Sequence, residues 1–317
     1  MTSPHGILLV DKAPERTSHD VVARVRWLLG TKKVGHAGTL DPMATGLLIL
    51  GIGQGTRLLT YLVGLDKTYE ATIRLGRATT TDDREGEDLG IHHDATAVSD
   101  TAIQEQLELL RGDIQQVPST VSAIKVDGKR AYARARAGEN VELAARPVRI
   151  SHLEVTGRRE VEGHLDLDAV VTCSSGTYVR ALARDLGAAL GVGGHLTALR
   201  RTSIGPFAVQ DGHKVPARGE GDDVDLPLGG LGETAARVLP VLTVDEQGAR
   251  DLADGRPIPR TEEQAVAPAG VPPVLRPEGE DRDVVAALDP QGALCAVLRP
   301  DGSRWRPAMV IPPEARC

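Results

Sequence analysis

Two segments in which apolar and polar residues alternate constrain the fold of this chain more than any other feature. Over residues 69–75 every odd position is apolar or aromatic and every even position is polar. Residues 165–171 begin with the same alternation. Successive side chains of a strand point to opposite faces of its sheet, so each segment predicts a strand with one face buried.

Helical spacing occurs elsewhere in the chain, in no regular order with the strands. Ser18 is a candidate N-cap for a helix that ends at Gly30, because apolar residues after it recur at helical spacing: Val21, Val25, Leu28 and Leu29. Further helices are expected at 102–110 and 179–190, and a polar, acidic loop at 79–94. Because regular βαβ alternation is missing from this pattern, the expected fold class is α+β.

The length and composition predict one large domain followed by a small one. The chain has 317 residues, of which 41% are hydrophobic, which is ample for a buried core. After Phe207 the composition changes, and residues 219–232 are rich in Gly and Asp. We expect a large domain at 1–207, a linker at 208–237 and a small β-rich domain at 238–317, with a mobile loop at 268–283.

The charge of the chain is unevenly distributed. The net charge is −7, yet residues 1–207 hold 25 basic and 25 acidic residues, so the whole acidic excess lies after them. Residues 125–149 hold seven basic and three acidic residues. Such a local basic segment can bind phosphates on a globally acidic protein, although a solvated helix face has the same composition.

Several classes of protein are disfavoured. The three cysteines, at 173, 295 and 317, include no CxxC pair, which argues against a zinc ribbon or a disulfide framework. Residues 1–6 lack the features of a signal peptide, and no apolar run approaches the roughly 18 residues of a membrane span. Dinucleotide and Walker A signatures are incomplete. We therefore expect a soluble, cytoplasmic protein.

The loop from Gly35 to Pro42 is the strongest local signal for chemistry. Asp41 precedes a proline, which favours an extended backbone outside any helix. Gly35 and Gly38 permit tight turns or the close approach of a ligand. The pattern presents one carboxylate on a stiff loop, and an ordinary Asp-Pro turn would have the same sequence.

Residues 35–48, GHAGTLDPMATGLL, resemble the nucleophile motif of the TruB family of bacterial tRNA pseudouridine-55 synthases. Five further blocks resemble motifs of this family in the expected order: 6–12, 66–70, 118–129, 173–187 and 196–201. The resemblance covers residues 6–207. Ala13 stands where the family usually has proline, which should loosen that loop slightly.

The resemblance implies the fold and the activity. It implies a mixed central β-sheet with flanking helices, an RNA-gripping thumb segment at 117–149, and a C-terminal domain of PUA type. It also implies that the chain isomerises uridine-55 in the T-loop of tRNA to pseudouridine. The expected partner is the tRNA T-arm, and the chain is expected to act as a monomer without cofactor, metal or membrane.

The resemblance also assigns roles at the catalytic centre. Asp41 matches the nucleophile, which attacks either the ribose C1′ or the base C6, and Arg180 matches its arginine partner. By itself Arg180 would be taken as a surface arginine that begins a helix. An ionised carboxylate in a closed site needs such a partner, and a nearby guanidinium lowers its pKa.

Further residues match those that bind the substrate. Tyr69 matches the tyrosine that stacks on the flipped uracil, and Tyr178 a second pocket tyrosine, although both could pack in a core. His36 matches a histidine that contacts the RNA, and Leu199 a pocket-wall residue. The candidate phosphate contacts are Lys12, Lys67, Lys125, Lys129, Arg130, Arg200 and Arg201.

Two other functions remain open. The first is a non-catalytic tRNA-binding or folding chaperone on the same scaffold, although pure binding would not need Asp41, Tyr69 and Arg180 together. The second is a carboxylate glycosidase. That chemistry normally uses two acids that face one bond, and the matched motifs contain no second acid.

Overall fold

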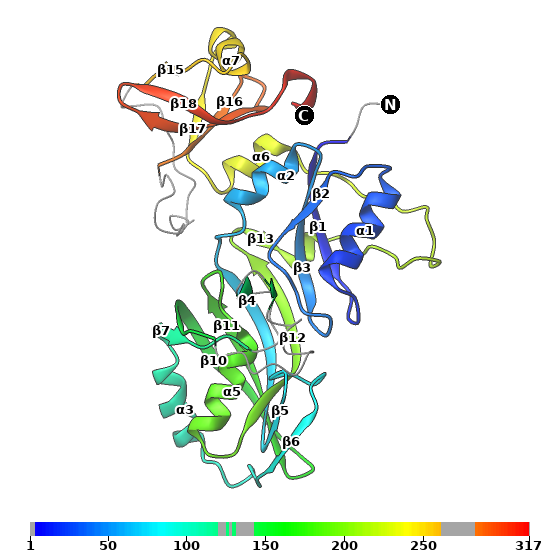
Figure 1. The fold of residues 1–317 in the computed structure, drawn as a ribbon, viewed down its shortest axis with the longest axis vertical. Helices are drawn as coiled ribbons and strands as arrows, with labels where there is room; N and C mark the ends of the chain where they lie inside the picture. The colour runs from blue at the N-terminus through cyan, green and yellow to red at the C-terminus, as the bar shows by residue number, and fades with distance from the viewer. Residues whose placement is uncertain (1–3, 120–124, 127–128, 131–142, 261–282, 317) are drawn as a thin grey trace. The chain divides into compact units, whose positions relative to one another are not determined.

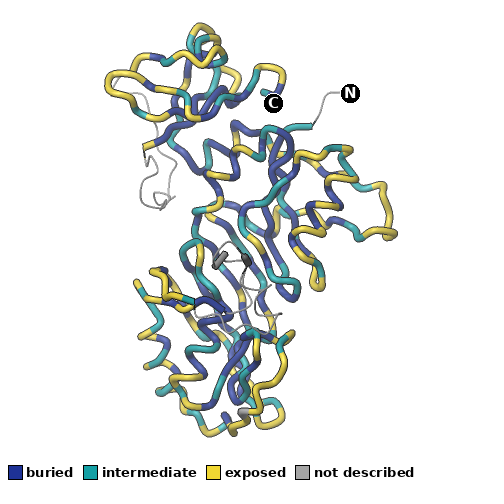
Figure 2. The backbone as a smooth tube through the Cα atoms, in the orientation of Figure 1, coloured by how far each residue is buried: buried dark blue, intermediate teal, exposed yellow. Residues whose placement is uncertain are grey.

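The alternating segments form neighbouring strands of one sheet (Figure 1). In the computed structural model, which describes residues 4–119, 125–126, 129–130, 143–260 and 283–316, β4 (Lys67–Leu75) pairs antiparallel with β11 (His164–Cys173). The odd positions of β4 from 67 to 75 are buried, whereas its even positions are exposed or half-buried (Figure 2). The period-2 prediction is therefore confirmed.

The chain divides into two compact units. Unit 1 comprises Met1–Pro42, Gly46–Leu65 and Ser203–Cys317, and unit 2 comprises Met43–Thr45 and Asp66–Thr202.

Unit 2 is built on a sheet with the strand order β12-β4-β11-β10-β7. The strands that flank β4 and β11 are β12 (Gly194–Ile204), β10 (Arg146–Val161) and β7 (Gly112–Gln116). Helix α5 (Val179–Ala189) packs on β4 and against α3 (Asp100–Leu109). Both helices begin and end within two residues of their predicted bounds, because each carries buried apolar residues at helical spacing.

The acidic segment 79–94 was predicted to be a loop, which is wrong in part. It contributes to a two-stranded sheet of β5 (Arg77–Thr79) and β6 (Asp88–His92). The prediction failed because few residues in this stretch are apolar, so no periodic pattern marks the strands.

The basic segment 117–149 is described in part. Strands β8 (Lys125–Val126) and β9 (Lys129–Arg130) pair antiparallel, and β10 begins at Arg146. The predicted thumb otherwise falls largely outside the described residues, as does most of the predicted loop 268–283.

In unit 1, β1 (Gly6–Lys12) and β2 (Val34–Ala37) both pair antiparallel with β3 (Thr45–Ile52). Helix α1 (Ser18–Leu28) ends two residues before the predicted Gly30, which lies just beyond it at a φ of +59°. Its N-cap is Thr17 and not Ser18. The Thr17 hydroxyl accepts from the Asp20 amide while the Asp20 carboxylate accepts from the Thr17 amide, which is a reciprocal capping box.

The C-terminal part of unit 1 is a five-stranded sheet, which confirms the predicted β-rich region. Its order is β14-β16-β17-β18-β15, with one short helix, α7 (Glu246–Ala253). The strand bounds are Val241–Thr243, Val285–Leu288, Leu294–Asp301, Arg304–Val310 and Ile258–Pro259, in that order. Short elements complete the unit: α2 (Gly55–Leu58), β13 (Phe207–Ala208), α6 (Leu231–Ala236) and 3-10 turns at Leu59–Tyr61, Val209–Asp211 and Pro313–Ala315.

One apolar core joins the N-terminal strands of unit 1 to this C-terminal sheet. It runs from Ile7 and Ile49 through Leu231 to Val297 and Ile311. The expected linker 208–237 takes part in the packing of the unit, since Leu226 is buried in the same core cluster as α1 residues and α6 lies within the segment. The domain boundaries at 207 and 238 stay a prediction.

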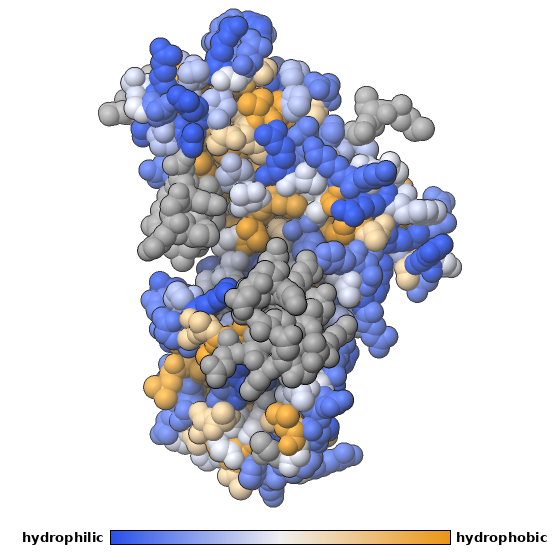
Figure 3. All heavy atoms as spheres, viewed as in Figure 1, coloured by the Kyte–Doolittle hydropathy of each residue, from blue (hydrophilic) through white to orange (hydrophobic). Residues whose placement is uncertain are grey.

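The predicted α+β class with a central sheet is confirmed. Hydrophilic residues cover much of the face drawn in Figure 3. Among the described helices, none is long and apolar enough to cross a membrane.

Candidate active site

Asp41 lies in the loop between β2 and β3, in unit 1, outside any helix as predicted. Its side chain is in a half-buried position. Gly38 has a φ of +88°, a left-handed conformation that glycine adopts without steric cost. This turn lets the chain leave β2 and present Asp41 before β3 begins.

The backbone on both sides of Asp41 is tied to the start of α1. The buried Ser18 hydroxyl accepts from the Leu40 amide at 2.9 Å and donates to the Leu40 carbonyl at 3.2 Å. The Pro42 carbonyl accepts from the Glu15 amide at 2.9 Å. These bonds hold the residues that precede and follow the carboxylate, so its backbone is fixed before any substrate binds.

Lys12 contributes to the same anchoring. Its ammonium donates to the carbonyls of Ala13, Arg16 and Pro42 at 3.0, 2.6 and 3.2 Å. The side chain is 1% exposed. An ammonium has three N–H donors, so this geometry favours a role in holding the loop. The contact of Lys12 with RNA stays a prediction.

Arg180 is the second residue of α5, in unit 2, and it is buried instead of exposed on a helix surface. One guanidinium nitrogen, Nη1, donates to the Thr81 carbonyl at 2.7 Å and lies 3.3 Å from the Asp83 carboxylate. The Asp83 carboxylate in turn accepts from the Thr81 hydroxyl at 2.6 Å and the Glu85 amide at 3.0 Å. The arginine is thus oriented by a carboxylate that is itself held in place.

Asp82 and Asp83 are functional candidates that sequence reasoning missed. Asp82 lies 3.3 Å from Arg184, one turn along α5 from Arg180, and has a φ of +60°. Burial raises the pKa of the Asp82 carboxyl, against the opposing effect of Arg184 and Arg180. An adjacent pair of aspartates in a polar stretch looks exposed, and only the position of α5 reveals that this pair is buried.

Tyr69 and Lys67 occupy the buried face of β4, two residues apart. Burial, together with the nearby Arg201 guanidinium, lowers the pKa of Lys67 to about 8. Burial also raises the pKa of the neighbouring Cys173 thiol to about 11. The side chain of Tyr69 is 7% exposed, which is consistent with packing in the core. Its stacking on a base stays a prediction.

The lowered pKa of Lys67 predicts a pH-dependent stability. Between pH 8 and the usual value of 10.5, the unfolded chain holds a proton that the folded chain has released, so the free energy of unfolding should rise with pH. The shift corresponds to at most about 3 kcal/mol. Urea unfolding at several pH values should show this rise in the wild type, and Lys67→Met should lack it. Parallel curves for the two proteins would contradict the assignment.

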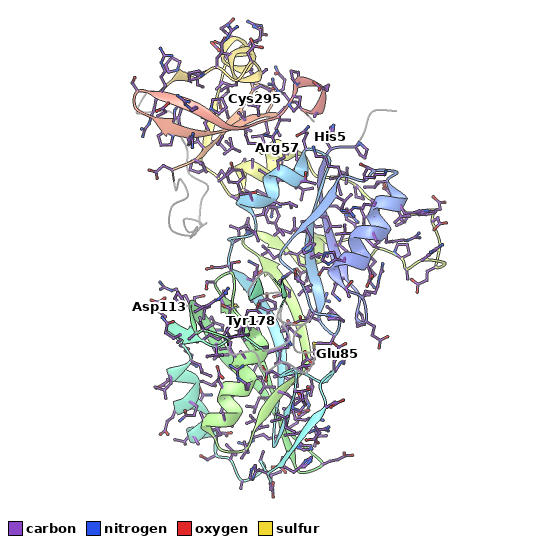
Figure 4. All side chains as sticks on the ribbon, viewed as in Figure 1. His5, Arg57, Glu85, Asp113, Tyr178 and Cys295 are labelled. Carbon is purple, nitrogen blue, oxygen red and sulfur yellow. The ribbon has the colours of Figure 1, made fainter. Side chains whose placement is uncertain are left out.

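Tyr178, labelled in Figure 4, is the N-cap of α5. Its backbone is bound by the side chain of Gln116, the last residue of β7. His36 lies in β2 with its ring edge-on to that of His19, at 5.6 Å between ring centroids.

The remaining predicted residues fall in unit 2. Leu199 and Arg201 are buried in β12, the neighbour of β4, and Arg200 donates to the Thr45 hydroxyl at 3.4 Å. For Lys125, Lys129 and Arg130 the structure describes only the strand pairing.

The predicted residues therefore form two groups. Asp41, His36 and Lys12 belong to unit 1, and Arg180, Tyr178, Tyr69, Lys67, Leu199, Arg200 and Arg201 to unit 2. Chemically, the first group offers a carboxylate on a fixed loop. The second offers a buried, oriented guanidinium and two tyrosines. In the described part of the chain, no three His, Cys, Asp or Glu residues lie close enough together to hold a metal ion.

Three family models match the chain in succession. They are the N-terminal domain of the TruB family pseudouridylate synthases over residues 26–179, the tRNA pseudouridylate synthase B C-terminal domain over 180–216, and the C-terminal region of tRNA pseudouridine synthase II over 239–312. Asp41, Tyr69 and Tyr178 lie within the first match, and Arg180 begins the second.

Relatives match over nearly the whole chain. A protein of Nocardia farcinica (strain IFM 10152) named tRNA pseudouridine synthase B is 52% identical over 310 residues, which is 98% of this chain and 94% of the relative. A protein of the same name from Arthrobacter sp. (strain FB24) is 50% identical over 311 residues, 98% of this chain and 97% of the relative.

Solved structures share the fold. A chain in a structure of an H/ACA RNP bound to a substrate RNA containing 2′-deoxyuridine has a TM-score of 0.68 at 22% identity, with 98% of this chain and 86% of that chain covered. A chain of a Cbf5-Nop10-Gar1 complex has a TM-score of 0.68 at 23% identity, with coverage of 97% and 85%. The fold and the sequence matches together define a pseudouridylate synthase. The chain belongs to the TruB family.

Proposed function

We propose that this chain converts uridine-55 in the T-loop of tRNA to pseudouridine, with Asp41 as the nucleophile. The observation that carries the proposal is the anchored Asp41 loop, in which Ser18, Glu15 and Lys12 hold the backbone on both sides of one carboxylate. The relatives named tRNA pseudouridine synthase B, at about half identity over nearly the full chain, support tRNA as the substrate.

The reaction is an isomerisation, so it changes no oxidation state. The bond between N1 of the uracil and C1′ of the ribose breaks, the uracil turns, and a bond between C5 and C1′ forms. The proton on C5 is lost and N1 gains one. Asp41 attacks either C1′ or the base C6 and is released when the new bond has formed, which is covalent catalysis.

Arg180 pairs with the Asp41 carboxylate in this proposal. A guanidinium carries five N–H donors in a rigid planar fork. This fork suits a carboxylate in bidentate geometry. Such a pair would keep Asp41 ionised and oriented toward the substrate.

The target base must leave its stack in the T-loop, at a cost of a few kcal/mol. In this proposal Tyr69 stacks on the flipped uracil, Tyr178 and the Leu199 backbone line the pocket, and His36 contacts the RNA near the vacated position. Stacking on an aromatic ring can recover roughly 1–3 kcal/mol per base. The proposed phosphate contacts are Lys12, Lys67, Lys125, Lys129, Arg130, Arg200 and Arg201.

In this proposal the chain also acts as a monomer, in the cytoplasm, without metal or cofactor. Nucleoside mapping of an unmodified tRNA transcript after incubation with the purified protein tests its core. We expect pseudouridine at position 55, and none when the transcript carries cytidine there. Tight RNA binding without pseudouridine would instead identify a tRNA-binding chaperone, and release of free uracil would identify a glycosidase.

A further inference from the structure

The side chain of Gln116 binds both backbone polar groups of a single residue, Tyr178. Its Nε2 donates to the Tyr178 carbonyl at 3.1 Å, and its Oε1 accepts from the Tyr178 amide at 2.8 Å. Gln116 is 2% exposed. A buried amide that makes two hydrogen bonds to the backbone of one residue is highly directional, because both of its polar ends are used.

These bonds fall at the point where α5 begins. Tyr178 is the N-cap, and its carbonyl also accepts the first helical bond, from the Leu182 amide at 3.3 Å. Within the described chain, α5 has no side-chain capping bond of the kind that Thr17 supplies to α1. Gln116 therefore reaches from β7 to hold a helix start that lacks its own cap.

The start of α5, which Gln116 holds, carries the Tyr178 and Arg180 side chains that are proposed to act on the substrate. Arg180 lies two residues after Tyr178, in the first turn of α5. A third hydrogen bond joins the same two segments, since Arg184 donates to the Val117 carbonyl at 2.7 Å. The end of β7 is thus fastened to α5 at Tyr178 and again farther along at Arg184.

We propose that Gln116 is a positioning residue for the reaction, which sets the first turn of α5 and through it the Tyr178 ring and the Arg180 guanidinium. This inference rests on the proposed function. A misplacement of about 1 Å in a catalytic group can cost on the order of 100-fold in rate. Gln116 lies outside all the motifs that the sequence resemblance identified, so its role follows from the geometry alone.

The test uses Gln116→Met, which keeps the side-chain length and loses both hydrogen bonds, in the full-length protein. Gln115→Met is the matched control, because Gln115 is the preceding residue of β7 and is exposed. We expect the single-turnover rate of pseudouridine formation to fall 10- to 100-fold in Gln116→Met, with tRNA affinity within threefold of wild type. Gln115→Met should match the wild type in both quantities.

A merely structural role predicts a different pattern. It would lower tRNA affinity and the folded fraction together with the rate, and that result would overturn the proposal, as would a rate within twofold of wild type. If Gln116→Met does not fold, Gln116→Glu serves in its place. It keeps the acceptor for the Tyr178 amide and removes the donor to the carbonyl, and the same loss of rate is expected.

Hydrogen exchange separates this inference from the proposed function. Amides in residues 178–182 should exchange faster in Gln116→Met than in Gln115→Met, whether or not the wild type makes pseudouridine. Unchanged exchange there would refute the positioning role by itself. A wild type that makes no pseudouridine would refute the proposed function and, with it, the effect on rate.

Discussion

Replacing Asp41 with asparagine should lower the rate of pseudouridine formation by more than about 1,000-fold, because removal of a catalytic nucleophile typically costs at least this much in rate. Asparagine has nearly the same shape but cannot form the covalent intermediate that an ionised carboxylate forms. The backbone bonds to Leu40 and Pro42 do not involve the Asp41 side chain, so the loop should keep its shape. Single-turnover assays with a tRNA transcript measure the rate.

Affinity for the same transcript should stay within about tenfold of wild type, because one lost hydrogen bond is typically worth about 0.5–1.5 kcal/mol net. Asp223→Asn is a matched control, since Asp223 is an exposed aspartate on a loop of unit 1. It should leave rate and affinity unchanged. Turnover near that of wild type in Asp41→Asn would remove Asp41 from the mechanism.

Replacing Asp83 with asparagine should destabilise the protein by about 3–5 kcal/mol, because one partner of a buried ion pair would be removed. The side chains of Arg180 and Asp83 are each 4% exposed, so water cannot take over the role of the carboxylate. The rate of pseudouridine formation should fall as well, since Arg180 would lose the contact that orients it. Urea unfolding and the single-turnover assay measure the two effects.

Asp82→Asn is the control for this variant, with the same chemical change at the adjacent position. Burial already raises the pKa of the Asp82 carboxyl and so disfavours its charged form, and Arg184 is partly exposed. Its loss should therefore cost much less than the loss of Asp83. The double variant Asp83→Asn with Arg180→Met should recover part of the lost stability, because no unpaired charge is left buried. Equal losses of unfolding free energy in the two single variants would show that the Arg180–Asp83 pair contributes no more to stability than the Arg184–Asp82 pair.

Much of the fold was predictable because its signals are local. The period-2 pattern over β4 and the apolar spacing over α1 report which face of each element is buried, and both predictions are confirmed. The N-cap of α1 was placed one residue late, since Thr17 and Ser18 are equally suitable caps by residue type. The structure uses Thr17 as the cap, and the Ser18 hydroxyl binds the loop before Asp41 instead.

The site likewise contains residues that a local sequence signal identified and residues that no such signal marks. Asp41 was identified because its loop combines glycines, a proline and a motif that resembles a family, all within one short segment. Asp83 and Gln116 carry no such signal, since their importance lies in what they contact. Asp83 faces Arg180 and Gln116 faces Tyr178, and each pair is far apart in the chain.

Local sequence patterns were enough to predict the α+β class, the alternating strands, the α1 and α5 helices, and the motifs that contain Asp41, Tyr69 and Arg180. These features depend on the order of residues within one element or one loop. The three-dimensional contacts were needed to show that Lys12 and Ser18 hold the Asp41 loop, that Asp83 is a buried partner of Arg180, and that Gln116 holds the start of α5. Hydrogen bonds between distant segments, and the burial of the residues that make them, depend on how the strands and helices pack. That packing cannot be inferred from any single segment of the sequence.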